Sequence, residues 1–120
     1  MLHNLCICLG VFPNIHKPRV VWVGIEGSVN ELVNLQKVID SRLAKLGFPS
    51  EKRPFSPHIT LARFHEKGDA KDIFDFADSV CKYKYEKRLR ILVDKVSLMR
   101  SQLLPTGAIY TRLNELQLID

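Results

Sequence analysis

The chain has 120 residues, of which 46% are hydrophobic and 26% are charged, and it carries a formal net charge of +5. These values are those of an ordinary globular domain with a modest core. No uninterrupted apolar run approaches the length needed to span a bilayer, so we expect no membrane association. A basic chain attracts polyanions, and RNA and nucleotides are the usual candidates.

The three cysteines, Cys6, Cys8 and Cys81, are odd in number and lack the spacing of a disulfide framework. This usage is typical of a reducing compartment, and we therefore expect a cytoplasmic protein. Cys6 and Cys8, taken with His3 and His16, also suggest a metal site. Because a Cys-x-Cys pair on a strand gives poor tetrahedral geometry, we expect no metal and no cofactor.

Two strands are predicted in the first 25 residues. Residues 5–9 form a short apolar segment that ends at Gly10, and residues 12–14 (FPN) have the composition of a turn. Residues 19–25 (RVVWVGI) are a continuous apolar run rich in β-branched residues, which predicts a strand covered on both faces. Trp22 lies inside this run, so a place in the core is favoured over a base-stacking role.

Two helices are predicted further along the chain. Ser28 and Glu31 have capping-box spacing, apolar residues follow at intervals of three and four, and Gly47 is placed to end the helix in a left-handed conformation. A second helix is expected to begin near Asp69 and to bury one apolar side. That side consists of Ile73, Ala77 and Val80.

The remaining segments complete an α+β pattern. Residues 49–57 contain three prolines and lead into a predicted strand at residues 58–61 (HITL). Apolar alternation over residues 89–93 resumes out of step at 96–98, which predicts a bulge near residues 94–95. A turn at residues 105–107 is expected to join two antiparallel strands. The order β-β-α-β-α-β-β predicts an α+β fold in which helices pack on one face of an antiparallel sheet.

His58 and Thr60 are the candidate chemical groups. Residues i and i+2 of a strand point the same way, so the imidazole and the hydroxyl share one face, opposite Ile59 and Leu61. An imidazole transfers protons near neutral pH, and a hydroxyl can hydrogen-bond a phosphate oxygen. A His-x-Thr motif taken alone is weak, because it arises by chance in many proteins.

The surrounding sequence makes the motif more specific. Residues 53–63 (RPFSPHITLAR) closely resemble the second signature of the RNA 2′,3′-cyclic phosphodiesterase and 2′-5′ RNA ligase family, in the 2H phosphoesterase superfamily. Residues 10–14 (GVFPN) and 19–24 (RVVWVG) are similar to the same family in order and spacing. So is the segment 101–110, which contains Pro105, Gly107, Ala108 and Tyr110.

This resemblance implies a fold of two similar α+β lobes around a cleft, each with one His-x-Thr motif. It implies metal-free hydrolysis of RNA 2′,3′-cyclic phosphate ends to 2′-phosphates, with 2′-5′ ligation of RNA in some members. By position, His58 and Thr60 match the second motif, in which the histidine transfers a proton and the threonine holds the phosphate. Arg63 matches a phosphate-contacting arginine. Tyr110 either lines the substrate cleft or only packs.

The sequence departs from the family pattern at the first motif, which would lie before Cys6 and is not found there. Residues 1–120 are therefore expected to form a single truncated domain, with one lobe and a fraction of the other. One histidine cannot serve as both acid and base, so we expect little activity from this chain alone. The alternative is a non-catalytic RNA- or nucleotide-binding remnant. An absent lobe would expose apolar surface, so self-association is also expected.

Strict alternation along residues 58–63 would place Arg63 on the Ile59 side. Contact between Arg63 and the phosphate therefore requires a bulge, or the end of the strand, between the two motif residues and the arginine. His65 follows just beyond and is expected in a loop, where it could border the cleft.

Overall fold

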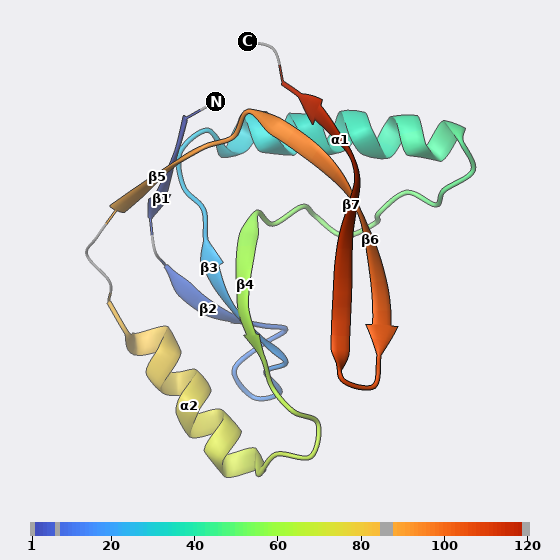
Figure 1. The fold of residues 1–120 in the computed structure, drawn as a ribbon. Coiled ribbons are helices and arrows are strands. Elements are labelled where there is room, and N and C mark those ends of the chain that lie inside the picture. The colour runs from blue at the N-terminus through green and yellow to red at the C-terminus, as the bar shows by residue number, and fades with distance from the viewer. Residues whose placement is uncertain (1, 7, 85–87, 119–120) are drawn as a thin grey trace.

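The computed structural model describes residues 2–6, 8–84 and 88–118. Figure 1 shows its strands and helices as one α+β arrangement, which confirms the predicted fold class. In chain order the elements are β1 (Leu2–Cys6), β2 (Leu9–Phe12), β3 (Val20–Gly24), α1 (Val29–Lys45), β4 (His58–Arg63), α2 (Ala70–Lys82), β5 (Arg88–Leu92), β6 (Lys95–Leu104) and β7 (Gly107–Gln117).

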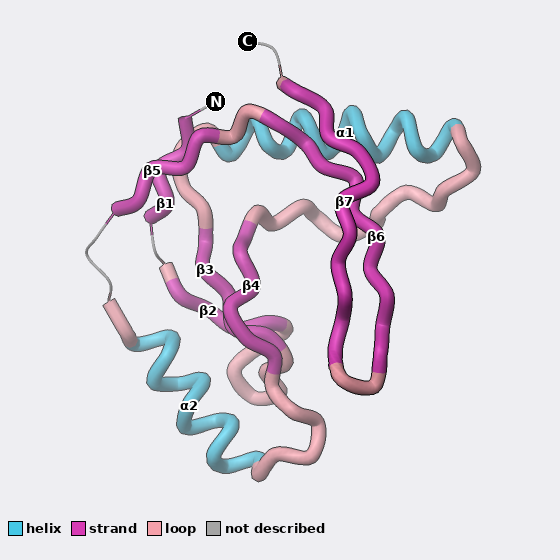
Figure 2. The backbone as a smooth tube through the Cα atoms, in the orientation of Figure 1, coloured by secondary structure: helices cyan, strands magenta, loops and turns pink. Residues whose placement is uncertain are grey.

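All strand pairs between described residues are antiparallel, and they form three separate sheets. β2, β3 and β4 form one sheet with β3 in the centre, β6 and β7 form a hairpin, and β1 pairs with β5. β1 and β5 lie side by side although they come from distant parts of the chain (Figure 2). The single strand predicted over residues 5–9 is therefore wrong, because β1 and β2 belong to different sheets.

The core lies between β3 and α2. The side chains of Val21 and Val23 are only 5% and 7% exposed, and Ala77 of α2 is fully buried. These valines alternate with less buried residues along β3, so the strand predicted over residues 19–25 is confirmed, but its two faces are covered unequally. The covered face is the one that α2 packs against.

α2 begins and packs as its sequence predicts. The Asp69 carboxylate accepts hydrogen bonds from the backbone N–H groups of Lys71 and Asp72, at 2.9 and 3.1 Å, and this caps the free amides of the first turn. Further along the helix, the ring of Phe76 meets Phe64, just after β4, edge to face with 5.9 Å between centroids. The cap and the aromatic contact hold α2 against the sheet.

α1 ends at a left-handed glycine, as predicted, but its apolar side is open. Gly47 has a φ of +94°, and the N–H of Phe48 reaches back to the carbonyl of Leu43 at 3.1 Å, which is the pattern of a Schellman cap. No residue of α1 is buried. A shallow groove of about 320 Å³ on this helix is lined in part by Leu32, Leu35, Ile39, Leu43 and Phe55.

The β6–β7 hairpin turns at residues 105–106 and continues from Gly107, whose φ is +132°. This confirms the predicted turn and the antiparallel pairing of the last two strands. The bulge predicted near residues 94–95 is wrong, because the alternation restarts there when the chain leaves the β1–β5 sheet for the hairpin. A bulge does occur inside the hairpin, where Leu113 has no partner between Leu98 and Met99.

Candidate active site

The pairing of β4 with β3 decides which β4 residues share a face. Opposite residues of an antiparallel pair lie on the same face, and alternate residues of β3 do so too. The three alternate β3 residues 20, 22 and 24 are paired with three predicted site residues. The pairs are Val20 with Arg63, Trp22 with Thr60 and Gly24 with His58. His58, Thr60 and Arg63 therefore lie on one face, called here the site face.

A β-bulge makes this arrangement possible. Ala62 is opposite Val21 and Thr60 is opposite Trp22, so Leu61 is an extra residue in β4 without a partner. An extra residue resets the alternation of the bulged strand. The bulge required for Arg63 to join His58 is therefore present, two residues before the arginine.

The His58 ring is held from two sides. Its Nδ1 lies 2.6 Å from the backbone carbonyl oxygen of Ser56. A carbonyl oxygen only accepts hydrogen bonds, so Nδ1 carries the proton and the neutral ring keeps its lone pair on Nε2. The ring of Phe12 meets the imidazole edge-on, with 5.0 Å between centroids and an interplanar angle of 85°. Nε2 is thus the atom of His58 that remains for proton transfer.

Trp22 lies on the site face and is partly buried, with its indole Nε1 fully buried, so the predicted place in the core is only partly right. Its indole stacks on Phe12 with 5.1 Å between centroids. Gly10 is opposite Trp22 in β2, and a Cβ there would overlap the indole ring. The absence of a side chain at Gly10 therefore lets the ring lie flat on β2. A glycine in the strand beside the tryptophan was the sequence signal for this close approach.

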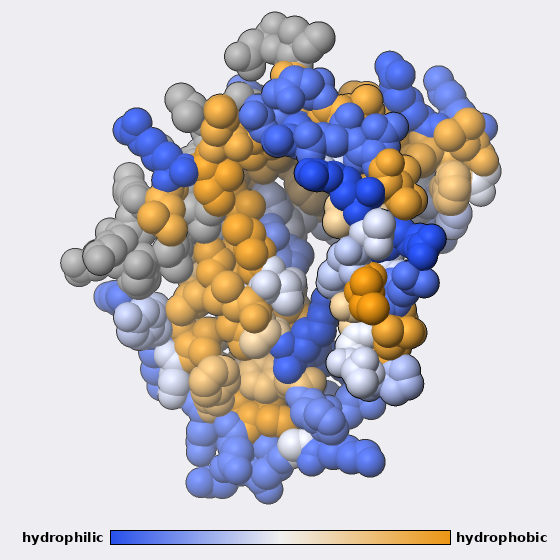
Figure 3. Space-filling model, viewed as in Figure 1, coloured by the Kyte–Doolittle hydropathy of each residue, from blue (hydrophilic) through white to orange (hydrophobic). Residues whose placement is uncertain are grey.

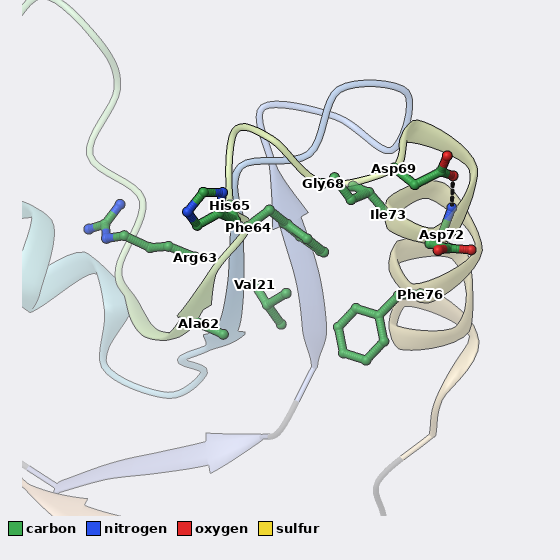
Figure 4. A pocket seen from close by; sticks show the side chains of 10 residues that line it. All are labelled: Val21, Ala62, Arg63, Phe64, His65, Gly68, Asp69, Asp72, Ile73 and Phe76. Carbon is green, nitrogen blue, oxygen red and sulfur yellow. Dashed lines mark hydrogen bonds between the residues drawn. The ribbon is translucent and has the colours of Figure 1, made fainter.

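The opposite face of the sheet holds a cavity of about 450 Å³ between β3, β4 and α2. Figure 4 shows Val21, Ile73 and Phe76 around this cavity, while the Arg63 side chain extends away from it on the other side of β4. The cavity lining includes Arg63 and His65 but not His58 or Thr60. The cavity is thus a gap between the sheet and α2, and His58 and Thr60 lie on the other side of the sheet.

Ile59 is on the covered side of the sheet, as predicted, because it pairs with Val23. It is nevertheless 42% exposed, and the bulged Leu61 is 56% exposed. β4 is an edge strand of its sheet, and α2 packs over β2 at the other edge. Neither side chain is therefore a buried core residue behind the motif.

Tyr110 is not brought to the other predicted site residues. It lies on β7, is 67% exposed and makes no ring contact with any described residue. His65, by contrast, lies beside Arg63 in Figure 4, and its Nδ1 accepts a hydrogen bond from the N–H of Lys67 at 3.2 Å. His65 therefore lies next to the Arg63 end of the site face.

Within the described ranges, no group of three or more histidine, cysteine, aspartate or glutamate side chains could hold a metal ion. The side chains of His3 and Cys6, which entered the metal prediction, lie outside the described residues. Cys8 and Cys81 are free thiols. No helix of the described chain is long and apolar enough to cross a bilayer.

Comparisons with known proteins place this arrangement in context. The model of the LigT-like phosphoesterase family matches residues 23–110. The RNA 2′,3′-cyclic phosphodiesterase of Aquifex aeolicus is 35% identical over 111 residues, which cover 92% of this chain and 57% of that protein. The protein of the same name from Archaeoglobus fulgidus is 37% identical over 102 residues, or 85% of this chain and 54% of that one.

A solved structure is similar over nearly the whole chain. The crystal structure of TT0787 from Thermus thermophilus aligns with 98% of this chain and 60% of that chain, with a TM-score of 0.59 and 26% sequence identity. The chain therefore spans a little over half the length of these three relatives.

Proposed function

This chain belongs to the LigT-like phosphoesterase family, and we propose that it supplies half of an active site that hydrolyses RNA 2′,3′-cyclic phosphate ends to 2′-phosphates. The site face carries the proposal, because a histidine with its Nδ1 fixed by Ser56 shares that face with Thr60 and Arg63. The relatives named RNA 2′,3′-cyclic phosphodiesterases support the same chemistry.

The proposed reaction needs two proton transfers. Water attacks the phosphorus, the bond from phosphorus to the 3′ oxygen breaks, and the phosphate stays on the 2′ oxygen. One group takes the proton from water and a second gives a proton to the leaving 3′ oxygen. His58 Nε2 performs one transfer, and a second histidine, which the family resemblance implies, performs the other. If a 5′ hydroxyl of RNA replaces water, the same step yields a 2′-5′ linkage.

Thr60 and Arg63 would hold the phosphate. The threonine hydroxyl can donate to a non-bridging oxygen, and the guanidinium offers charge and paired donors to the same group. This division of roles uses side chains alone and no metal ion. Tyr110 would approach the substrate from β7 once the two halves of the site are assembled.

The free thiols of Cys8 and Cys81 support a reducing, cytoplasmic setting.

The test joins the chain to a lobe that carries the first His-x-Thr motif, because little activity is expected from this chain alone. It follows conversion of a nucleoside 2′,3′-cyclic phosphate by ³¹P NMR, together with titration of a nucleoside 2′-monophosphate. We expect His58→Ala to lower the rate by roughly 10²- to 10⁴-fold, the usual contribution of one acid–base group. Ile59→Ala, on the other face, is the matched control and should keep the rate. Equal rates for wild-type and His58→Ala chains, or a 3′-phosphate product, would contradict the proposal. Binding without conversion would favour the non-catalytic alternative.

A further inference from the structure

A groove of about 640 Å³ lies at the Arg63 end of β4. Its walls are two loops, residues 13–19 between β2 and β3 and residues 64–69 between β4 and α2. The N–H of Phe64 donates to the carbonyl oxygen of Arg19 at 2.9 Å, which joins the two loops at the base of the groove.

The groove is basic. Three cationic side chains line it, Lys17, Arg19 and Arg63, against one carboxylate, Glu66. Arg19 and Glu66 approach to 3.5 Å, but their side chains are 74% and 84% exposed, so this ion pair is weak and leaves the positive charge largely available. Two imidazoles, those of His16 and His65, add further nitrogen groups to the lining.

The loop from residue 13 to residue 19 has a fixed shape. The Asn14 side-chain oxygen accepts hydrogen bonds from the N–H groups of His16 and Lys17, at 2.9 and 3.1 Å. The ring of His16 stacks on Phe74 of α2, with 6.0 Å between centroids and an interplanar angle of 24°. The cations of this loop are therefore carried on a preformed scaffold, which lowers the entropic cost of binding a ligand.

Arg63 connects the groove to the site face, because it lines the groove and also shares a face with His58 and Thr60. A 2′,3′-cyclic phosphate exists only at the 3′ end of an RNA chain. All other nucleotides of that chain must therefore leave the site on the 5′ side. A basic groove that begins at the phosphate-binding arginine is placed to take their phosphates.

We propose that this groove binds the phosphodiester backbone of single-stranded RNA on the 5′ side of the reactive end. The proposal rests on the function proposed above and narrows its substrate class. The preferred substrate is an oligonucleotide that ends in a cyclic phosphate, and a cyclic mononucleotide uses the site face alone.

The experiment measures binding of three ligands to the 120-residue chain. These are a labelled hexaribonucleotide with a 2′,3′-cyclic phosphate end, the same RNA with a 3′ hydroxyl, and a nucleoside 2′,3′-cyclic phosphate. The double variant Lys17→Ala, Arg19→Ala removes two charges from the groove. The matched control Lys37→Ala, Lys45→Ala removes two charges from α1, which does not line the groove.

We expect the groove variant to bind both hexaribonucleotides more weakly by the same factor, roughly 2- to 30-fold. Its binding of the mononucleotide should be unchanged. For the groove variant, the slope of log K against log salt concentration should become less steep by about 0.7 for each RNA phosphate that is no longer neutralised. The α1 control should match wild type in all three titrations. These results together would support the groove as the RNA path.

The proposal fails if the hexaribonucleotides bind no more tightly than the mononucleotide, or if the groove and α1 variants lose equal affinity. It also fails if a polyglutamate peptide binds as tightly as the RNA, because the groove would then be a surface for acidic proteins. Groove-dependent RNA binding by a chain that hydrolyses no cyclic phosphate even when joined to a lobe with the first His-x-Thr motif would overturn the proposed function and leave the groove assignment intact. If that joined protein hydrolyses the hexaribonucleotide in a way that depends on His58 but not on the groove, the proposed function stands and the groove assignment fails.

Discussion

The β2–β3–β4 sheet and the β6–β7 hairpin are both antiparallel and both rich in apolar residues, but only the sheet has a core. Val21 and Val23 in the sheet are 5% and 7% exposed, whereas Leu98 and Leu103 in the hairpin are 61% and 86% exposed. In Figure 3 a gap separates the surface of the sheet from that of the hairpin. The difference is α2, which covers one face of the sheet.

Apolar alternation therefore makes a strand but does not by itself make a core. A core forms only where a second layer covers the apolar face. His58, Thr60 and Arg63 lie on β4, which is supported by its pairing with β3, the strand that carries the buried valines. Tyr110 stands on the uncovered hairpin, and its predicted contribution to the site depends on what the hairpin meets.

The largest effect should come from placing a charge in the core. Val23→Asp would bury a carboxylate between β3 and α2 and should cost more than about 4 kcal/mol of unfolding free energy. Leu103→Asp on the hairpin should stay within about 0.5 kcal/mol of wild type. Urea unfolding measures both. Similar losses at the two positions would mean that the hairpin is as well covered as the sheet.

The next effect separates the two faces of β4. Thr60→Ala removes one hydrogen bond to a charged phosphate and should lower turnover roughly ten- to a hundredfold with little change in stability. Ile59→Ala should cost roughly 1–2 kcal/mol, because this side chain is only partly buried, and should keep turnover. Parallel rate and unfolding measurements on both variants give the answer. If Ile59→Ala lowered turnover and Thr60→Ala lowered only stability, the assignment of His58 and Thr60 to the site face would be wrong.

The close contact between Gly10 and Trp22 can be tested in the same way. Gly10→Ala forces a methyl group against the indole and should cost roughly 1–3 kcal/mol. It should also move Phe12, which stacks on Trp22 and contacts His58, and should therefore lower turnover. Ala108→Val adds volume to the exposed hairpin and is the control, for which we expect no loss of unfolding free energy. Unchanged stability of Gly10→Ala would show that the indole lies elsewhere.

How far the sequence alone predicts this molecule depends on the range of each interaction. The end of α1 at Gly47, the start of α2 near Asp69 and the turn before Gly107 follow from local chemistry, and all three are confirmed. The role of Trp22 and the bulge at Leu61 depend on partners in neighbouring strands. The alternation along β4 showed that a bulge was needed for Arg63 but could not place it, since register is a property of the pair.

Self-association should follow from the open hairpin. Val96 pairs with Leu116, and Leu98 alternates with Val96, so Leu98 and Leu116 lie on one face, where they are 61% and 67% exposed. Apolar patches of this kind favour association. We expect dimers in sedimentation velocity at high concentration, and the variant Leu98→Lys, Leu116→Lys should shift them toward monomer. A wild-type chain that stays monomeric throughout the concentration range would contradict this.

The smallest effect concerns residues 48–57, which connect α1 to the motif strand. The Nε of Arg53 lies 3.2 Å from Oε1 of Glu51. Hydrogen bonds from Arg53 and its positive charge lower the pKa of Glu51 from 4.5 to about 2. The N–H of Glu51 also donates to Asp40 of α1 at 3.0 Å. The segment is therefore tied at one end to the helix that has no buried residues, and at the other to the strand that carries His58.

The sign of the pH effect follows from the lowered pKa of Glu51. The folded chain holds the Glu51 proton less tightly than the unfolded chain, so the contribution to stability is present above pH 4.5 and is lost as the pH falls toward 2. Because both groups are exposed, the effect should be small. Arg53→Gln should lower the urea midpoint slightly at pH 7 and not at about pH 2.5, where most of the linkage is lost. Lys82→Gln, which breaks an i,i+4 pair with Asp78 on α2, controls for the loss of a surface charge. If the difference in urea midpoint between wild type and Arg53→Gln grew as the pH fell, the ion pair would oppose folding. The segment before His58 would then be held by the contact between Glu51 and Asp40 alone.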